Sequence, residues 1–536
     1  MATTQRTRRR NSWTKTVIAG AAALTLAVLT ACTTVENDPP EAPTTGPTSM
    51  EPDLPGVSVP LPDLAPPIPL AELGDFTGVA RLDMGSSCTG TIIETGVDDG
   101  PAYLITNGHC TGDVGRAPQA VTVGEEWFGQ AFLLDTYDNP SPLTLNAEAL
   151  EYSTMRGRDV AIVRLKESLG ELKGLGIDPI PIIDEEPAPG TAVRNIAAPV
   201  QDLDWDDWVL RTGDCTLTHQ TDLLEFRWLW TDAWANDCPG VRMGSSGSPL
   251  LTLNDDGGPA AIAAVINTTT WGSSVDNGGL CFLNRPCEFG DDGLTMVEET
   301  SYAVSVAGVG RCFVDGVFTL GGDCPLEVSS VWANTGGGIF RGGDLPDAVG
   351  QTAQADLVIN PAFADSAPVR TALVELTRST VCTDPAVYAD YATAEASIAP
   401  AVEDPWDPGL VLPVTLPEEE GHYALCAVAG DDYAGAAAVV FEVDRTPPLF
   451  QPGASVEDLG EGNVSIAPFL NPPELSTVRF TWVEGDTECP TTEQFQDFFI
   501  VPLMLEAEHL PATYCIYGLD QAGNTTDVVR IPIAAR

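Results

Sequence analysis

The sequence predicts an all-β protein built from barrels or sandwiches. Short apolar runs, such as GTII at residues 90–93, YLIT at 103–106 and VAIV at 160–163, are separated by glycine, aspartate and proline. This is the pattern of strands joined by tight turns. Helical periodicity is scarce between residues 72 and 330, and strands without alternating helices favour a barrel or a sandwich. The length of 536 residues suits about two to four domains.

The composition indicates a folded protein that does not bind nucleic acid. An apolar fraction of 43% provides material for several cores, and 77 acidic against 25 basic residues give a net charge of -52. Such a charge repels phosphate backbones and anionic lipid headgroups. It fits a soluble, self-repelling surface, a salty habitat or a preference for cationic substrates, and the sequence leaves these readings open.

Residues 1–31 have the organisation of an export signal. A basic start precedes an apolar run at residues 17–31, which is short for a membrane span. The run ends in LTAC at residues 29–32, which resembles the bacterial lipobox, where the signal peptide is cut before a cysteine that becomes lipid-modified. We therefore expect a lipoprotein signal peptide at 1–31 and a lipid on Cys32, which would anchor the exported protein to the extracytoplasmic face of a bacterial membrane. The alternative is an ordinary signal peptide that happens to contain a cysteine.

Residues 32–71 are expected to form an extended stalk. Eleven prolines stand among threonine, glutamate and aspartate in residues 33–71. This composition does not build a core and favours polyproline conformations. We place the first folded domain after this spacer, at residues 72–330.

The stretch most suggestive of chemistry is the turn MGSSGSPL at residues 243–250, which leads into an apolar strand. A serine is a poor nucleophile unless a base and an oxyanion site surround it. The small Gly244 allows its own N–H and that of Ser246 to point at one spot, where they could hold an oxyanion. Many turns rich in glycine and serine only reverse the chain. The catalytic interpretation therefore depends on whether the sequence offers a base and an acid as partners for Ser246.

His109 is the candidate base for Ser246. It follows the strand-like run 103–108 at a position from which a loop can project the imidazole, whereas His219 has no neighbour that suggests a role and the other two histidines lie in a C-terminal repeat. Asp159 opens the apolar run 160–163. An acid in that place is suited to orient the imidazole and to stabilise its charged form.

Together, TNGHC at 106–110, RDVAIV at 158–163 and GSSGSP at 244–249 resemble the three active-site motifs of trypsin/chymotrypsin-like serine proteases. The order His, Asp, Ser is that of this family and differs from subtilisins and α/β-hydrolases. The pair DC at 237–238, with Cys215 upstream, further resembles the bacterial branch that includes glutamyl and lysyl endopeptidases. The resemblance covers about residues 72–330 and implies a chymotrypsin-like double β-barrel.

The resemblance implies roles for four residues. Ser246 is the expected nucleophile, His109 the general base and then acid, Asp159 its orienter, and Gly244 with Ser246 the oxyanion donors. The implied reaction is cleavage of a protein or peptide substrate through an acyl-enzyme, with no cofactor, and no zinc-binding spacing is present. The competing hypothesis is a surface adhesin or binding protein that uses a protease-like scaffold. The sequence does not indicate an oligomeric state.

The resemblance also indicates where a substrate side chain would bind. In this family the residue six positions before the nucleophile floors the primary pocket, and here it is Gly240. The far wall is expected near Thr270, Trp271 and Gly272, with Asp276 beyond it as a candidate negative charge for lysine or arginine. No histidine lies in that segment, which argues against glutamyl specificity.

A repeat follows a glycine-rich linker expected at residues 331–350. The stretches YALCAVAGDDYAG at 423–435 and TYCIYGLDQAGN at 513–524 can be laid over each other, and each copy has one upstream cysteine. Each block has about ninety residues, the size of an immunoglobulin-like sandwich, and the pattern resembles bacterial immunoglobulin-like or fibronectin-type surface modules. We expect module 1 at 351–446 and module 2 at 447–536. Such modules bind ligands or act as spacers, and spacing is the preferred interpretation.

Thirteen cysteines leave twelve (13 − 1) once Cys32 is set aside, an even number that suits disulfides outside the reducing cytoplasm. Sequence does not fix connectivity, so the proposed pairs each stay within one domain. They are Cys88–Cys110, Cys215–Cys238, Cys281–Cys287 and Cys312–Cys324 in the protease-like domain, and Cys382–Cys426 and Cys489–Cys515 in the modules.

The chain departs from the digestive members of the family just before the nucleophile. Those proteases have an aspartate there, which pairs with a new amino terminus released by cleavage, whereas this chain has Ser245. A neutral hydroxyl cannot form that ion pair. We therefore predict that the fold itself orders the oxyanion turn and that the enzyme is active without cleavage between residues 33 and 76.

Overall fold

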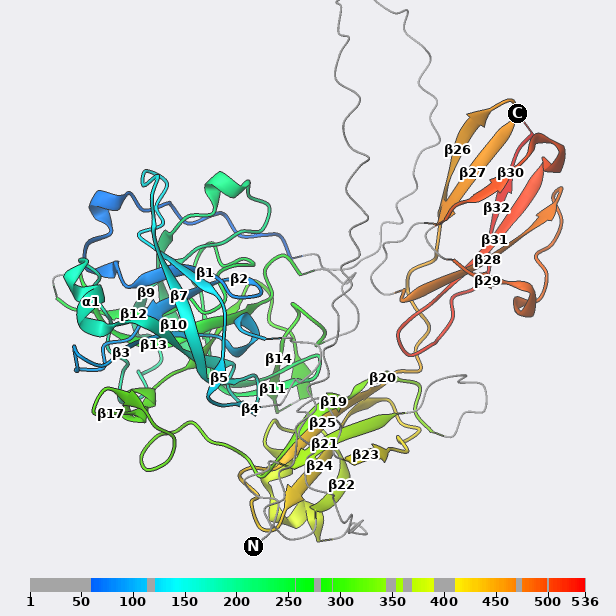
Figure 1. The fold of residues 1–536 in the computed structure, drawn as a ribbon. Helices are drawn as coiled ribbons and strands as arrows, with labels where there is room; N and C mark the ends of the chain where they lie inside the picture. Colours follow the sequence, from blue (N-terminus) through cyan, green and yellow to red (C-terminus); the bar gives the residue numbers. More distant parts are fainter. Residues whose placement is uncertain are drawn as a thin grey trace, which may run out of the picture. The chain divides into compact units, whose positions relative to one another are not determined.

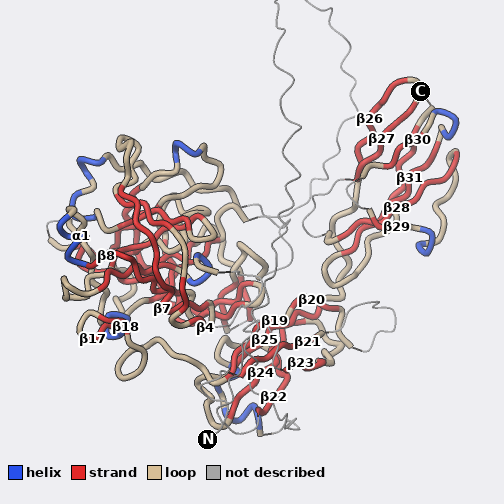
Figure 2. Tube along the Cα trace, viewed as in Figure 1, coloured by secondary structure: helices blue, strands red, loops and turns tan. Residues whose placement is uncertain are grey.

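The computed structural model describes residues 59–112, 121–255, 257–273, 281–291, 293–343, 353–359, 369–389, 410–468, 475–498 and 501–535. Within these ranges the regular secondary structure is mostly β-strand, with one short α-helix, α1 (Leu169–Gly174), and several 3-10 turns (Figures 1 and 2). The strands form closed barrels followed by two-sheet sandwiches, so the predicted all-β fold class is confirmed. Cys32, the signal peptide and residues 32–58 of the expected stalk lie outside the described ranges.

The first barrel closes on itself. Its strand order is β7-β6-β1-β2-β3-β8, and a further pairing of β7 with β8 completes the cylinder. The strands are β1 (Val79–Asp83), β2 (Ser87–Ile92), β3 (Pro101–Thr106), β6 (Gln130–Leu133), β7 (Leu143–Thr154) and β8 (Val160–Ser168), with β4 (Val121–Thr122) and β5 (Glu125–Glu126) added on β7. Small and branched side chains fill the interior, among them Ala80, Leu82, Leu104, Ala161 and Val163.

The second barrel is built in the same way. Its order is β11-β16-β13-β12-β9-β10, and β11 also pairs with β10. The strands are β9 (Ala192–Ala197), β10 (Arg211–Glu225), β11 (Trp228–Asn236), β12 (Pro249–Leu253), β13 (Pro259–Thr269) and β16 (Ser301–Ser305), with β14 (Cys287–Gly290) and β15 (Gly293–Thr295) continuing from β10. Val193, Leu217, Trp234, Leu250 and Ile266 belong to its core.

An apolar layer joins the two barrels. It includes Tyr103, Ile105 and Ile162 of the first barrel and Leu251 and Ile262 of the second. Successive strand residues point to opposite faces, so alternate residues fill a barrel and line this layer. The segment after β16 returns to the first barrel through η6 (Val309–Cys312), β17 (Phe313–Val314) and β18 (Val317–Phe318).

Residues 59–71, expected at the end of the stalk, pack on the second barrel. Val59, Ala65 and Ile68 are buried, and Pro67 forms an isolated bridge with Arg211. The turns η1 (Leu70–Glu72) and η2 (Gly74–Phe76) then lead into β1. The folded region therefore includes residues ahead of position 72, because a proline-rich segment can offer apolar rings and free carbonyls to a neighbouring surface.

The next region is a sandwich of two sheets. One sheet has the order β19-β21-β23 and the other β20-β25-β24-β22. The strands are β19 (Val331–Gly336), β20 (Gly338–Phe340), β21 (Gln354–Ile359), β22 (Val369–Glu375), β23 (Leu410–Pro413), β24 (Gly421–Ala429) and β25 (Ala437–Val443). Side chains from both sheets, including Leu357, Leu425, Val439 and Phe441, form the core.

Strands β19 and β20 occupy a stretch where the glycine content predicts a linker. β19 pairs with β21, and β20 pairs in parallel with β25, so these residues belong to the sandwich. The glycines allow the chain to cross between the two sheets instead of forming a linker. Gly337 and Gly338 have φ angles of 76° and 139°, which glycine adopts readily, and they carry the chain from one sheet to the other.

The last region is a second sandwich with the sheet orders β26-β27-β30 and β29-β28-β31-β32. The strands are β26 (Ala454–Gly460), β27 (Asn463–Pro468), β28 (Thr477–Glu484), β29 (Gln496–Asp497), β30 (Leu503–Leu505), β31 (Ala512–Leu519) and β32 (Val529–Ile533). Its core includes Val464, Phe480, Tyr514 and Ile516. The two sandwiches thus repeat one plan, as the sequence repeat suggests.

Six disulfides link cysteines of the described ranges, and all six pairs are those expected from the sequence. They are Cys88–Cys110, Cys215–Cys238, Cys281–Cys287, Cys312–Cys324, Cys382–Cys426 and Cys489–Cys515. Such a set is typical of proteins outside the reducing cytoplasm. No helix in the described ranges has the length and apolar character needed to span a membrane.

Candidate active site

Asp159 precedes β8 directly, and its side chain is fully buried. It accepts two hydrogen bonds from His109. The His109 backbone N–H donates to Oδ1 at 3.0 Å, and Nδ1 of the imidazole lies 2.6 Å from Oδ2. The amide of Asn107 donates to the backbone carbonyl of Asp159 at 2.7 Å. These contacts fix the carboxylate and the imidazole relative to each other.

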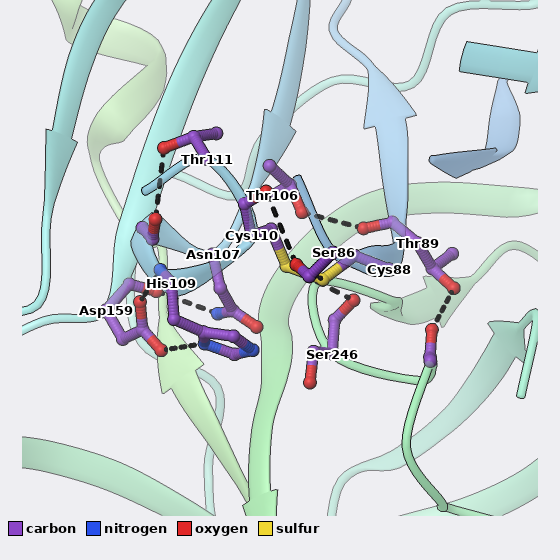
Figure 3. The surroundings of a disulfide bond; sticks show 12 residues. Ser86, Cys88, Thr89, Thr106, Asn107, His109, Cys110, Thr111, Asp159 and Ser246 are labelled. Atoms are coloured by element: carbon purple, nitrogen blue, oxygen red, sulfur yellow. Dashed lines mark hydrogen bonds and ion pairs between the residues drawn. A yellow bond between two sulfur atoms is a disulfide. The ribbon is translucent and has the colours of Figure 1, made fainter. Parts of the chain in front are cut away.

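His109 is presented by a short turn, η3 (Gly108–Cys110), that follows β3. The turn passes so close to β7 that a Cβ on Gly108 would lie 2.1 Å from the carbonyl oxygen of Thr154. Only a residue without a side chain fits there. The disulfide Cys88–Cys110 ties the end of the turn to β2 (Figure 3). The position of the imidazole therefore depends on both neighbours of His109 in the chain.

The bond to Asp159 determines which ring nitrogen of His109 is available. When Nδ1 donates to the carboxylate, Nε2 of the neutral ring is left as a proton acceptor. The His109 side chain is 20% exposed, while that of Asp159 is inaccessible. A partly exposed acceptor backed by a buried carboxylate is the arrangement that a general base requires.

Opposing effects act on the pKa of His109. Burial acts to lower this pKa, but the charge of Asp159, the hydrogen bond to it and the charge of Glu225 outweigh burial and raise the pKa above its ordinary value. Glu225 ends β10, is 4% exposed and accepts a hydrogen bond from the N–H of Asn284 at 2.7 Å. Burial raises the pKa of Glu225 to about 7. A second carboxyl near the histidine is thus close to its own titration point at neutral pH.

Ser246 lies in the turn before β12, and both barrels hold this turn. The N–H of Thr89 donates to the Ser246 carbonyl at 2.8 Å, and the Thr89 hydroxyl donates to the Gly244 carbonyl at 2.9 Å. From the second barrel, the carbonyl of Ile266 accepts from the N–H of Gly247 at 2.8 Å. These hydrogen bonds hold the backbone of the turn in one conformation.

Two N–H groups of this turn are left free. Those of Gly244 and Ser246 donate to no acceptor among the described residues, while the N–H groups at positions 245, 247 and 248 are all bonded. Gly244 has a φ of 95°, and a Cβ there would lie 2.7 Å from the carbonyl oxygen of Ala198. Free donors in a rigid turn can stabilise a developing oxyanion without reorganising.

Ser246 lies on the side of the imidazole away from Asp159 (Figure 3). No hydrogen bond joins the side chains of these two described residues. Catalytic hydrogen bonds are often long before substrate binds and tighten in the complex. The first barrel carries His109 and Asp159, and the second carries Ser246.

Two of the expected pocket residues contact the segment 59–69. Gly240 lies against Ala65, such that a Cβ at position 240 would be 2.5 Å from the Ala65 nitrogen. The N–H of Gly272 donates to the carbonyl of Pro60 at 3.0 Å. The expected floor and far wall of the pocket therefore both contact the segment 59–69, whose composition predicts part of the stalk.

The other expected pocket residues are less directly connected to this segment. Thr270 is buried, and its hydroxyl donates to the carbonyl of Val297 at 2.8 Å. Trp271 follows and is half-buried. Asp276 lies outside the described residues, so its proposed contact with a basic substrate side chain remains a hypothesis.

The sequence does not predict a role for three residues that contribute to the site, which are Thr89, Asn107 and Glu225. Asn107 stands inside the histidine motif, but its bond to the Asp159 carbonyl depends on the tertiary fold. Glu225 gives one signal, since it is an acid within the apolar run LLEF at 223–226. An acid in such a run is seldom buried without a specific reason.

Two other groups of histidine and cysteine among the described residues are candidates for a site. His219 is half-exposed and pairs with Glu288 at 3.0 Å. The possible ligand atoms of Cys88, His109 and Cys110 lie within 4.8 Å of one another, but both sulfurs belong to one disulfide. Metal binding by cysteine requires a thiolate, so this group cannot hold a metal in the oxidised protein.

Comparison with known proteins gives matches among solved structures. No protein-family model and no curated protein matches this chain. The thermostable serine protease AL20 from an extremophilic microorganism is 14% identical, with 44% of this chain and 93% of that chain covered and a TM-score of 0.28. Protease Anisep from Arthrobacter nicotinovorans is 12% identical, with 44% and 92% covered and a TM-score of 0.28. A Glu endopeptidase in complex with MPD is 16% identical, with 47% and 96% covered and a TM-score of 0.31. TM-scores this low carry no functional weight, so the function has to be inferred from the site itself.

Proposed function

We propose that the protein is a membrane-anchored, extracytoplasmic serine endopeptidase. The observation that carries the proposal is a carboxylate-bound imidazole beside a serine whose turn has two N–H groups without an acceptor among the described residues. The nucleophile needs a base, the base needs an orienting acid, and the intermediate needs hydrogen-bond donors. Residues at one place between the two barrels can supply all of these.

In the proposed reaction, Ser246 Oγ attacks the carbonyl carbon of a peptide bond while Nε2 of His109 takes the hydroxyl proton. The carbonyl oxygen becomes an oxyanion, which the N–H groups of Gly244 and Ser246 bind. His109 then gives the proton to the leaving amine, and the C–N bond breaks to leave an acyl-enzyme. Water, activated by His109, hydrolyses the ester and restores the serine.

Asp159 has an orienting and an electrostatic role in this scheme. Each proton that His109 takes up creates an imidazolium beside a buried carboxylate, and their attraction is stronger there than in bulk water. The raised pKa of His109 is consistent with that stabilisation. Asp159→Asn would favour the wrong tautomer, and we expect kcat to fall by about 10⁴-fold.

The experiment that tests the activity is labelling with a fluorophosphonate, which phosphonylates an activated serine. We expect one adduct, mapped to Ser246, which is lost in Ser246→Ala and retained in the control Ser141→Ala on an exposed loop. A peptide library then identifies the residue preferred at the cleaved bond. A folded protein without an adduct and without cleavage would favour the alternative, a binding protein on a protease-like scaffold.

The anchor is tested separately. The proposed lipid on Cys32, with the several acyl chains of a mature bacterial lipoprotein, would hold the protein firmly at a membrane. Cys32→Ala should move it from the membrane fraction to soluble or unprocessed forms. Unchanged partitioning would refute the anchor and leave the proposed catalysis intact.

A further inference from the structure

The segment of residues 59–69, here called the strap, has a regular pattern of burial. Its sequence is VPLPDLAPPIP, and its buried residues are Val59, Pro62, Ala65 and Ile68, one in every three. A period of three is that of a polyproline II helix, and Pro69 has the matching φ of −73° and ψ of 149°. The strap therefore lies along the second barrel with one face against it.

A polyproline II helix makes no internal hydrogen bonds, so its carbonyls can accept from a neighbour. Here the barrel supplies the donors. They are the N–H of Gly272 to Pro60, the Arg242 guanidinium to Pro62, Nη1 of Arg211 to Ala65 at 3.1 Å, and the N–H of Thr212 to Pro66 at 3.1 Å. In return, Val59 donates to Ser273 at 2.9 Å and Ile68 to Leu210 at 3.0 Å.

Part of the strap lies against the expected walls of the specificity pocket. Gly240 contacts the backbone of Ala65, and a Cβ on Gly272 would lie 2.6 Å from Cδ2 of Leu61. The floor and the far wall are separate in sequence, and the strap contacts both. None of the hydrogen bonds of the strap named above goes to the described residues His109, Asp159 or Ser246.

Arg242 connects the strap to the turn that carries the serine. Its side chain donates to the carbonyl of Pro62. Its backbone N–H donates to the Ser245 hydroxyl at 3.2 Å, and its carbonyl accepts from the N–H of Ser245 at 2.9 Å. Ser245 is buried directly before Ser246. Arg242 thus links the strap to the turn that carries Ser246.

We propose that the strap is a built-in positioning element, which holds the walls of the specificity pocket in their binding shape while the chain upstream remains continuous. This rests on the proposed peptidase function. Arg242 and the buried strap residues are positioning residues, since they act through Gly240 and Gly272. The proposal gives a physical basis for activity without cleavage between residues 33 and 76.

The test compares two strap variants in the full mature chain. Ala65→Glu places a charge against Gly240, while Asp63→Ala changes an exposed strap residue and is the matched control. We expect Ala65→Glu to lower kcat/KM for peptides by about 10- to 100-fold, since small misplacements of distant residues have such effects. Hydrolysis of p-nitrophenyl acetate, which does not fill the pocket, should change far less, and Asp63→Ala should behave as wild type.

Arg242 provides a second variant that does not depend on burying a charge. Arg242→Met removes the donor to Pro62, and Arg242→Lys keeps one. We expect the same loss on peptides for the methionine variant and partial rescue by lysine. Equal peptide cleavage by wild type, Ala65→Glu and Arg242→Met would overturn the proposal, and so would a gain of activity, which would make the strap an inhibitor.

Hydrogen exchange separates this proposal from the proposed catalysis. In Ala65→Glu, the amides of residues 240–246 and 270–273 should exchange faster than in wild type, whereas those of β1 to β3 should not. This readout needs no enzymatic activity. Wild-type exchange in those two loops would refute the positioning role even if the enzyme is active, and absent labelling of Ser246 with faster exchange would refute only the catalysis.

Discussion

Glu225 is a titratable residue near His109 that is not a member of the proposed triad. Its carboxyl group is buried at the end of β10, and its charge acts on His109. Because burial raises its pKa to about 7, its charge changes over the range in which the histidine also titrates. Interacting groups of this kind titrate as a coupled system, so a pH profile reports on both.

Glu225→Gln should shift the acid limb of the kcat/KM profile to lower pH. The ionised carboxylate favours the imidazolium and raises the pKa of His109, so the neutral amide lets that pKa fall, and the free base persists at lower pH. The measurement is a pH–rate profile on one peptide, with the exposed Glu126→Gln as control. An unmoved limb, or a shift to higher pH, would contradict this coupling.

Gly247 shows how closely the two barrels approach the nucleophile. A Cβ there would lie 2.1 Å from Oγ1 of Thr106 and 2.2 Å from the carbonyl oxygen of Thr89, and φ is 78°. We expect Gly247→Ala to displace the turn, to destabilise the fold by about 2 kcal/mol or more and to abolish labelling of Ser246. Thermal unfolding and labelling measure both effects. The control is Gly174→Ala, which has open space around it; similar losses there would show that the effect is not local.

The residues of the proposed triad can be singled out in the sequence because each stands in a short local motif with turn-forming or strand-forming neighbours. Ser246 follows a glycine, and Asp159 precedes an apolar strand, so both can be recognised in the linear chain. Thr89 and Glu225 could not be assigned a role. Thr89 bonds to Gly244 and Glu225 interacts with His109, and in each pair the two residues lie far apart in sequence. Only the folded arrangement of the strands brings each pair together.

At the scale of elements, the disulfide Cys88–Cys110 positions the η3 turn. Replacing both cysteines by serine should cost about 2–4 kcal/mol and should also reduce activity, because the histidine precedes Cys110. The control is the same change at Cys489–Cys515, which spans a loop of similar length, 26 against 22 residues, in the second sandwich. Calorimetry and peptide cleavage are the readouts. Equal loss of activity in the two double variants would exclude a local role for Cys88–Cys110.

Elements rich in glycine or proline were the hardest to predict. Proline content made residues 59–71 look like a solvated stalk, and glycine content made residues 331–340 look like a linker. Both are ordered because their backbone groups bond to partners from other elements, Gly272 for the strap and β21 and β25 for the strands. Composition predicts the conformation that a segment prefers in isolation, and it does not show which part of the fold the segment packs against.

At the scale of the whole molecule, the charge of -52 should make stability depend on salt. Repulsion among surface carboxylates favours expansion, and salt screens it, with a Debye length that falls from about 30 Å at 0.01 M to about 3 Å at 1 M. We therefore expect Tm to rise with sodium chloride over this range at pH 7. Scanning calorimetry provides the measurement. A constant or falling Tm would mean that local ion pairs, which salt weakens, outweigh the overall repulsion.

The division of the proposed triad between two barrels has a consequence for biogenesis. His109 and Asp159 belong to the first barrel and Ser246 to the second, 137 positions beyond the histidine (246 − 109). Neither barrel alone holds both the proposed nucleophile and the proposed base, so we expect a chain with separately folded but undocked barrels to be inert. If the proposed activity holds, the onset of hydrolysis marks the completion of folding, and the unfinished chain is protected from digestion by unfinished copies of itself.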